Sequence, residues 1–165
     1  MDFPNLPYLI DGDFKLTESE AICRYIIKRG GKTDLLGKDV KDQARVDNIL
    51  GVIDDLSTPT IQLCMSEKFE EDKEKVFADK VKAKADLIYK FLGNKEWMLG
   101  YLTLADFKVA EAVNYLQGIW PEHLKEYPHM IALKERFNKL PEIEAYYASA
   151  NAIKGPFLPP SAKWH

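Results

Sequence analysis

Two short apolar segments near the start of the chain are separated by turn residues and predict a β-hairpin. The strands are Tyr8-Leu9-Ile10 and Phe14-Lys15-Leu16, and Asp11-Gly12 between them is a two-residue turn signal. Leu6-Pro7 precedes the first strand. Because proline lacks an N–H and restricts the residue before it to extended geometry, the Leu6 backbone could face an extended peptide. A lone hairpin is only marginally stable, so we expect a further strand to pair with its open edge.

Apolar residues at helical spacing follow the hairpin directly. We predict a first helix from Ser19 to Arg29 that stops at Gly30-Gly31, a helix C-cap signal. The stripe expected to be buried consists of Ala21, Ile22, Tyr25 and Ile26. Residues 17–19 open this helix, so its free N–H groups and positive end favour an anion such as a carboxylate.

The next two helices differ in their charge. After a loop over residues 31–38, a long helix from about Asp39 to Met65 is expected to kink at Pro59. A charged helix over about residues 70–92 follows, whose Lys and Glu residues indicate a solvated face. Its expected core face consists of Val76, Phe77, Val81, Leu87, Ile88, Phe91 and Leu92.

A capping box marks the start of the most apolar helix. The Thr103 hydroxyl is expected to cap the helix start, and Asp106 to reach back to the Thr103 N–H. This helix should run to about Gly118, with further helices beginning at Pro128 and after Leu140-Pro141. We expect the tail to be extended over residues 155–160 and to pack back on the body over residues 161–165.

Composition narrows the class of protein. A net charge of −3 over 165 residues argues against nucleic acid as a partner. Cys23 and Cys64 fall in apolar-periodic segments, which indicates reduced buried thiols and a cytoplasmic protein. The sequence contains no apolar run long enough to span a membrane and no visible signal peptide. The three histidines are scattered, so we expect no metal site.

Several motifs, in the same order, resemble glutathione S-transferases, most closely the mu class. Phe3–Gly12 together with Glu18–Ile22 resembles the second half of the family's N-terminal domain, and Thr103–Phe107 resembles the capping box of its helical domain. Further similarities lie at Leu63-Cys64, Lys68-Phe69-Glu70, Phe91-Leu92-Gly93, Pro156, Phe157, Ala162, Lys163 and Trp164. The resemblance implies a mainly α fold. A truncated thioredoxin-like α/β fragment, a hairpin plus a helix over residues 1–31, would precede an all-helical C-terminal domain over residues 32–165.

The resemblance also implies an activity and a binding site. The activity is attack of the glutathione thiolate on small hydrophobic electrophiles, with glutathione as co-substrate and no cofactor. Leu6-Pro7 matches the cis-proline position, where the backbone before the proline pairs with the cysteinyl part of glutathione, and Asn5 lies near the same peptide. Glu18 and Ser19 match the pair that holds the γ-glutamyl end. The mu class usually has Gln at position 18, and a Glu there can still pair with the ligand's ammonium group.

The remaining implied residues concern the electrophile and a two-fold dimer. Met65 stands in the electrophile pocket where mu enzymes have a tyrosine. Asp55 matches an acidic residue that reaches across the dimer toward the γ-glutamyl group. Phe3 matches an aromatic key that inserts into the partner subunit, and Arg24 and Asp47 match an inter-subunit ion pair. Read without the resemblance, Ser19 is a plain helix cap, Phe3 ordinary packing, and Arg24 and Asp47 solvated charges.

The resemblance further implies that the family's first strand, first helix and second strand are absent, together with the tyrosine that stabilises the glutathione thiolate. Tyr8 is expected in a core strand and is no substitute, so we assign no catalytic residue and expect the chain alone to be inactive. Three hypotheses follow. The chain is a transferase whose N-terminal segment was left out, or a silent truncated paralogue that serves as a structural or scaffolding subunit of a larger assembly. The third and least favoured hypothesis is a glutathione-binding carrier without turnover.

Overall fold

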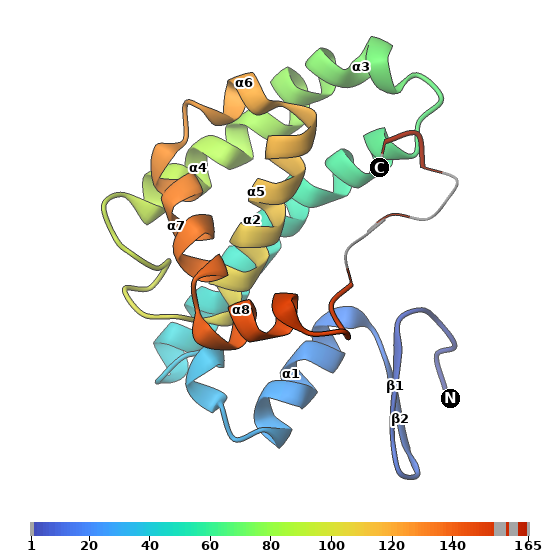
Figure 1. Ribbon diagram of the computed structural model, residues 1–165, viewed down its shortest axis with the longest axis vertical. Helices are drawn as coiled ribbons and strands as arrows, with labels where there is room; N and C mark the ends of the chain where they lie inside the picture. Colours follow the sequence, from blue (N-terminus) through green and yellow to red (C-terminus); the bar gives the residue numbers. More distant parts are fainter. Residues whose placement is uncertain (1, 154–157, 159–161, 165) are drawn as a thin grey trace. The chain divides into compact units, whose positions relative to one another are not determined.

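The fold is mainly α-helical with a single described hairpin, in agreement with the predicted fold class (Figure 1). The computed structural model describes residues 2–153, 158 and 162–164. The strands are β1 (Tyr8–Asp11) and β2 (Phe14–Thr17), and the helices are α1 (Ser19–Arg29), the 3₁₀-helix η1 (Thr33–Leu36), α2 (Val40–Cys64), α3 (Phe69–Val76), the π-helix η2 (Phe77–Val81), α4 (Lys82–Leu92), α5 (Leu104–Ile119), α6 (Pro121–Leu124), α7 (Pro128–Asn138) and α8 (Pro141–Ala148).

The chain forms two compact units. The first unit comprises residues 1–45 and holds the hairpin, α1 and η1, and the second comprises residues 46–165. The division is placed where residues on each side contact mainly other residues of their own unit. The domain boundary after residue 31, which follows from the family resemblance, stays a prediction.

The hairpin of the first unit turns one residue later than predicted. Asp11 pairs with Phe14, so the two loop residues are Gly12 and Asp13 rather than Asp11 and Gly12. Gly12 has φ +62°, and a tight hairpin that begins on a positive φ favours glycine at this first loop position. Because the turn moves by one residue, Asp11 becomes part of β1 and lies opposite Phe14.

Helix α1 begins and ends where the sequence predicts. It is followed by a Schellman motif, in which the Gly31 N–H donates to the Lys28 carbonyl at 3.1 Å and the Lys32 N–H to the Ile27 carbonyl at 3.0 Å. The expected buried stripe is wrong, because α1 contains no buried residue and Ile26 is exposed. The helix packs on the hairpin through Tyr25, whose ring lies 5.1 Å from that of Phe14.

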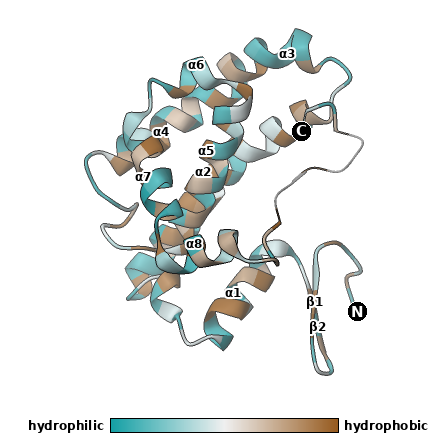
Figure 2. Ribbon diagram, in the orientation of Figure 1, coloured by the Kyte–Doolittle hydropathy of each residue, from teal (hydrophilic) through white to brown (hydrophobic). Residues whose placement is uncertain are grey.

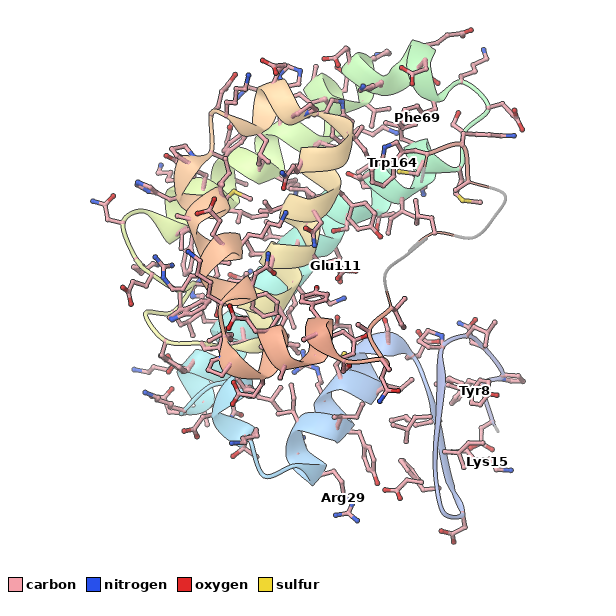
Figure 3. All side chains as sticks on the ribbon, viewed as in Figure 1. Tyr8, Lys15, Arg29, Phe69, Glu111 and Trp164 are labelled. Atoms are coloured by element: carbon pink, nitrogen blue, oxygen red, sulfur yellow. The ribbon has the colours of Figure 1, made fainter. Side chains whose placement is uncertain are left out.

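The two faces of the hairpin differ in what covers them. Phe14 and Asp11 contact Tyr25 of α1, so their face of the hairpin lies toward the helix. Strand residues alternate between faces, which places Tyr8 and Ile10 on the opposite face. Figure 3 shows Tyr8 and Lys15 on the side of the hairpin away from α1, and Figure 2 shows hydrophobic positions along both strands. Tyr8 is 54% exposed, so its expected place in a core strand is wrong.

The second unit is built around one hydrophobic cluster to which all the larger helices contribute. Helix α2 continues through Pro59 as predicted. Helix α5 supplies Val109, Val113 and Leu116 to the cluster and packs against α6 and α7. The segment over residues 31–38, expected to be a loop, contains η1.

The charged helix contains a π-turn that the sequence did not reveal. Helices α3 and α4 are joined without a break by η2, and the Trp120 indole N–H donates to the Lys73 carbonyl at 3.2 Å just before it. A π-turn adds a residue to one turn and so shifts every later position around the helix. The buried residues are therefore Phe77, Val81, Ala85, Ile88 and Leu92, whereas Leu87 and Phe91, which we expected in the core, are exposed.

The predicted capping box of α5 is confirmed and fully buried. Asp106 Oδ2 accepts hydrogen bonds from the Thr103 N–H at 2.8 Å and the Thr103 hydroxyl at 3.0 Å. Asp106 Oδ1 accepts a hydrogen bond from the Met98 N–H at 2.7 Å, so one carboxylate joins the segment between α4 and α5 to the start of α5. Burial raises the pKa of the Asp106 carboxyl group, and the hydrogen bonds oppose that shift.

The tail packs back on the second unit where it is described. Leu158 and Ala162 are buried, and the Lys163 N–H donates to the Cys64 carbonyl at 2.7 Å. Trp164 lies against α5, because a Cβ added to Gly118 would sit 2.2 Å from its ring atom Cζ2 (Figure 3). The expected extension over residues 155–160 falls mostly outside the described residues, as do the motif residues Pro156 and Phe157.

The first test concerns Asp106. Asp106→Ala leaves the Met98 and Thr103 N–H groups buried without their acceptor. We therefore expect the free energy of unfolding to fall by about 3 kcal/mol. Urea denaturation measures this free energy. Asp13→Ala, in the exposed hairpin turn, is the control and should change it by less than about 0.5 kcal/mol. A loss at Asp106 no larger than at Asp13 would show that the carboxylate does not organise the fold.

The second test concerns Gly118. Gly118→Ala places a methyl group inside the Trp164 ring, so we expect the tail to detach locally and the free energy of unfolding to fall by about 1–3 kcal/mol. Near-ultraviolet circular dichroism reports the tryptophan environment, and urea denaturation reports stability. Gly51→Ala in α2 is the matched control, because its Cβ meets no atom within 4 Å and should raise helix stability. An unchanged tryptophan signal in Gly118→Ala would contradict the packing described here.

Candidate functional site

The segment before β1 is exposed but tied to the hairpin. The Leu6–Pro7 peptide bond is cis, and Leu6 is 78% exposed. The buried Thr17 hydroxyl, at the end of β2, donates to the Phe3 carbonyl at 2.7 Å. This hydrogen bond holds residues 3–7 beside the start of α1, so the Leu6 backbone lies within the same small region as Glu18 and Ser19.

Asn5 connects the two halves of this region. Its carboxamide oxygen accepts the Leu6 N–H at 2.9 Å, and its amide nitrogen donates to Glu18 Oε1 at 3.3 Å. Asn5 and Glu18 are 13 residues apart in the sequence. The structure thus brings together three residues that the resemblance assigned to the glutathione site, and their ligand roles stay predictions.

The start of α1 offers uncapped N–H groups. Glu18 is the N-cap residue, with φ +70°, a left-handed conformation that is uncommon for a residue with a side chain. Its side chain makes no capping hydrogen bond, while its carbonyl accepts the Ile22 N–H at 2.9 Å. Ser19 is the first helical residue and is exposed, so it does not occupy the N-cap position that a plain cap would require. This geometry suits an anion at the helix start.

Asp55 and Met65 belong to the second unit. Asp55 is exposed on α2, and its Oδ2 lies 2.6 Å from the Nζ atom of Lys84 on α4. Met65 follows the last residue of α2 and is partly open to solvent. The contact between Asp55 and Lys84 could not be predicted from the sequence, because the two residues are 29 positions apart.

The second unit also holds two groups of potentially reactive chemistry, the Cys64 thiol and the Tyr115 hydroxyl. Desolvation raises the pKa of the buried Cys64 thiol to about 11, so this thiol is protonated and unreactive at neutral pH. Burial also raises the pKa of the Tyr115 hydroxyl, and the Tyr115 ring lies 6.1 Å from that of Trp164. Neither group has the depressed pKa expected of a nucleophile or an activated acid.

The residues assigned to a dimer interface are accessible in part. Phe3 is 78% exposed, as an aromatic key would require, and Asp47 is exposed on α2. Arg24 is half-buried on α1. Their roles between subunits stay predictions.

An open surface cavity of about 390 Å³ lies between the hairpin and α1 and was not predicted. Its lining includes Leu9, Asp11, Tyr25, Ile26 and Arg29. The Tyr25 hydroxyl donates to Asp11 Oδ2 at 2.6 Å, which raises the pKa of that hydroxyl. Arg29 Nε lies 3.6 Å from the same oxygen, so the cavity has one neutralised polar edge and otherwise apolar walls.

The described residues form no group of three or more His, Cys, Asp or Glu side chains that could hold a metal ion. Within the same residues, no helix has both the length and the apolar character needed to cross a membrane.

Comparison with known protein families matches both parts of the chain. The model of the glutathione S-transferase C-terminal domain matches residues 54–150, and that of the N-terminal domain matches residues 1–28. Glutathione S-transferase Mu 1 of Bos taurus is 36% identical over 165 residues, which cover 99% of this chain and 74% of the relative. The class-mu 26 kDa isozyme 51 of Fasciola hepatica is 35% identical and is covered to 70%, with 94% of this chain matched.

Solved structures of the same kind are similar in fold. The glutathione S-transferase Blo t 8 has a TM-score of 0.81 at 25% identity, covering 98% of this chain and 76% of that protein. The rat hPGDS complexed with a quinoline has a TM-score of 0.76 at 28% identity, covering 86% and 71%.

Proposed function

The chain belongs to the glutathione S-transferase family, and we propose that it is a mu-like member that binds glutathione for conjugation to small hydrophobic electrophiles. The observation that carries this proposal is the convergence of the Leu6 backbone, the Glu18 carboxylate and the uncapped start of α1. The three groups complement, in order, a peptide bond, an ammonium and a carboxylate. Glutathione carries all three.

Each group has a separate task in the proposed site. The γ-glutamyl carboxylate binds at Ser19 and the first N–H groups of α1, where the helix dipole is positive. The Glu18 carboxylate pairs with the γ-glutamyl ammonium through a charge-assisted hydrogen bond. The Leu6 backbone pairs with the cysteinyl residue, beside Pro7.

A second copy of the chain completes the proposed arrangement. Asp55 reaches toward the γ-glutamyl group bound by the other subunit, and Phe3 inserts into that subunit. Arg24 and Asp47 form an ion pair between subunits, and a two-fold axis uses each contact twice. Met65 contributes an apolar wall to the pocket for the electrophile. The exposure of Phe3, Asp55 and Met65 supports these assignments.

Bound glutathione reacts with an electrophile only if its thiol is deprotonated to the thiolate. A thiol with an ordinary pKa is mostly protonated at neutral pH and needs a positioned donor to stabilise the anion. Tyr8 lies on the hairpin face away from α1. Among the residues assigned to the site, Ser19 alone has a hydroxyl, and that hydroxyl is assigned to the γ-glutamyl carboxylate. We therefore propose that the 165-residue chain by itself binds glutathione without accelerating conjugation.

A second candidate function is that of a silent structural subunit in a larger assembly. The observation in its favour is the uncovered apolar face of the hairpin, where Tyr8 and Ile10 are more than half exposed. A partner that covers this face would explain these side chains without any glutathione chemistry. Binding of glutathione distinguishes the two candidates.

The third test therefore measures binding and turnover together. We expect glutathione to raise the melting temperature of the purified chain, since a ligand specific for the native state stabilises it. Ser19→Ala should weaken binding about tenfold through loss of a charge-assisted hydrogen bond, while Ser57→Ala on α2 should leave it unchanged. Conjugation of a chlorodinitrobenzene-type electrophile should stay near the uncatalysed rate. Absence of any binding would favour the structural subunit, and clear turnover would refute the proposed inactivity of the isolated chain.

The fourth test concerns the Lys84–Asp55 ion pair. The Lys84 ammonium competes with the ligand's ammonium for the Asp55 carboxylate, so Lys84→Met should tighten glutathione binding about two- to fivefold at low salt. Titration calorimetry at two salt concentrations measures the change, which should shrink as salt is added. Lys80→Met, on the exposed surface of the same helical run, is the control. Unchanged or weaker binding in Lys84→Met would exclude this role for Asp55.

A further inference from the structure

The side chain of Asn5 forms hydrogen bonds with two residues of the proposed glutathione site, Leu6 and Glu18. A carboxamide has an acceptor oxygen and a donor nitrogen held in one plane. In this chain the oxygen accepts the Leu6 N–H at 2.9 Å, and the nitrogen donates to Glu18 Oε1 at 3.3 Å. The Asn5 carboxamide therefore connects the Leu6 backbone with the Glu18 carboxylate, two of the three groups of the proposed site.

Glu18 needs such support because of its backbone. A residue with a side chain at φ +70° lies in a region that is unfavourable relative to ordinary conformations. Three contacts of the described residues oppose that cost. The Glu18 carbonyl accepts the Ile22 N–H, the neighbouring Thr17 hydroxyl bonds to the Phe3 carbonyl, and Asn5 holds the carboxylate. Only the contact with Asn5 acts on the side chain that would meet a ligand.

We propose that Asn5 is a positioning residue, which holds the Glu18 carboxylate in place for a cationic group of the ligand. This inference rests on the proposed function and names the ligand feature that Asn5 serves, the γ-glutamyl ammonium. The Asn5 amide engages Oε1 of Glu18, which leaves Oε2 to receive the ammonium. A carboxylate fixed in this way loses less side-chain entropy when it binds.

The two hydrogen bonds of Asn5 have different consequences for binding. The Leu6 N–H has one proton, so a ligand carbonyl must replace Asn5 Oδ1 there. Leu6 is exposed, and water can take the same place when the ligand is absent, so this hydrogen bond adds little to affinity. The hydrogen bond to Glu18 remains during binding and decides the effect of Asn5.

The fifth test is a double-mutant cycle on Asn5 and Glu18 with two ligands. The ligands are glutathione and its deamino analogue, which lacks the γ-glutamyl ammonium, and titration calorimetry on the full chain measures the dissociation constants. Asn5→Ala should weaken glutathione binding about five- to tenfold and binding of the analogue less than twofold. In a Glu18→Ala background, Asn5→Ala should have no further effect, because the group that it positions is gone.

Controls separate positioning from folding and from direct contact. Asn94→Ala, in an exposed position outside both units' site residues, should bind like the unmodified chain. Equal weakening for both ligands, or a full additional loss in the Glu18→Ala background, would show that Asn5 contacts the ligand directly or acts only on the fold. Either result would overturn the inference. If Asn5→Ala does not fold, Asn5→Ser replaces it in the double-mutant cycle.

A measurement without ligand keeps the inference testable even if glutathione does not bind. Nuclear magnetic resonance couplings report the side-chain rotamer of Glu18, and the Leu6 amide shift reports its hydrogen bond. We expect Asn5→Ala to average the Glu18 rotamer and to shift the Leu6 amide resonance. A fixed Glu18 rotamer in this variant would refute the positioning role, whereas absent binding with an averaged rotamer would refute only the proposed function.

Discussion

The helical unit depends on one buried carboxylate. Asp106 accepts three hydrogen bonds from Met98 and Thr103, and these bonds join the segment before α5 to the start of that helix. Helix α5 begins at this cap and runs through the centre of the hydrophobic cluster. Because α5 also packs against α6 and α7 and carries Gly118 beneath Trp164, the position of its first turn fixes much of the unit.

The first unit is held together by different forces. Its helix α1 contains no fully buried residue and its hairpin exposes Tyr8 and Ile10, so these elements bury less apolar surface than the helices of the second unit. Hydrogen bonds of side chains add to that packing. Thr17 holds Phe3, Asn5 holds Glu18, and the Tyr25 hydroxyl holds Asp11. The hydrogen bond of Thr17 is partly buried, whereas those of Asn5 and Tyr25 are exposed and individually weak, so the proposed glutathione site rests on a few contacts of modest strength.

The features of the fold that were predicted correctly depend on interactions between residues close together in the sequence. The capping box at Thr103 and Asp106 and the glycines after Arg29 act within one helical turn, and both were located from the sequence. The π-turn after Val76 leaves no local signature, and it moved Leu87 and Phe91 out of the core.

The site could be predicted only as far as the family motif reaches. The resemblance named Asn5, Leu6, Glu18 and Asp55, but no periodicity links Asn5 to Glu18 or Asp55 to Lys84. Those contacts depend on how separate elements pack, which a single sequence does not encode in any short-range pattern. The hairpin turn was misplaced by one residue for a related reason. Gly12 can occupy either loop position, and only the pairing of Asp11 with Phe14 decides between them.

The charges of the proposed site follow from these two long-range contacts. Asp55 is paired with the Lys84 ammonium, so the ligand's ammonium meets a neutral pair at that position. Glu18 accepts a hydrogen bond from the uncharged amide of Asn5. In the proposed site, recognition of the γ-glutamyl ammonium therefore falls mainly on Glu18. The Glu18 carboxylate can form a charge-assisted hydrogen bond with that ammonium, whereas the Lys84 ammonium already lies 2.6 Å from Asp55 Oδ2.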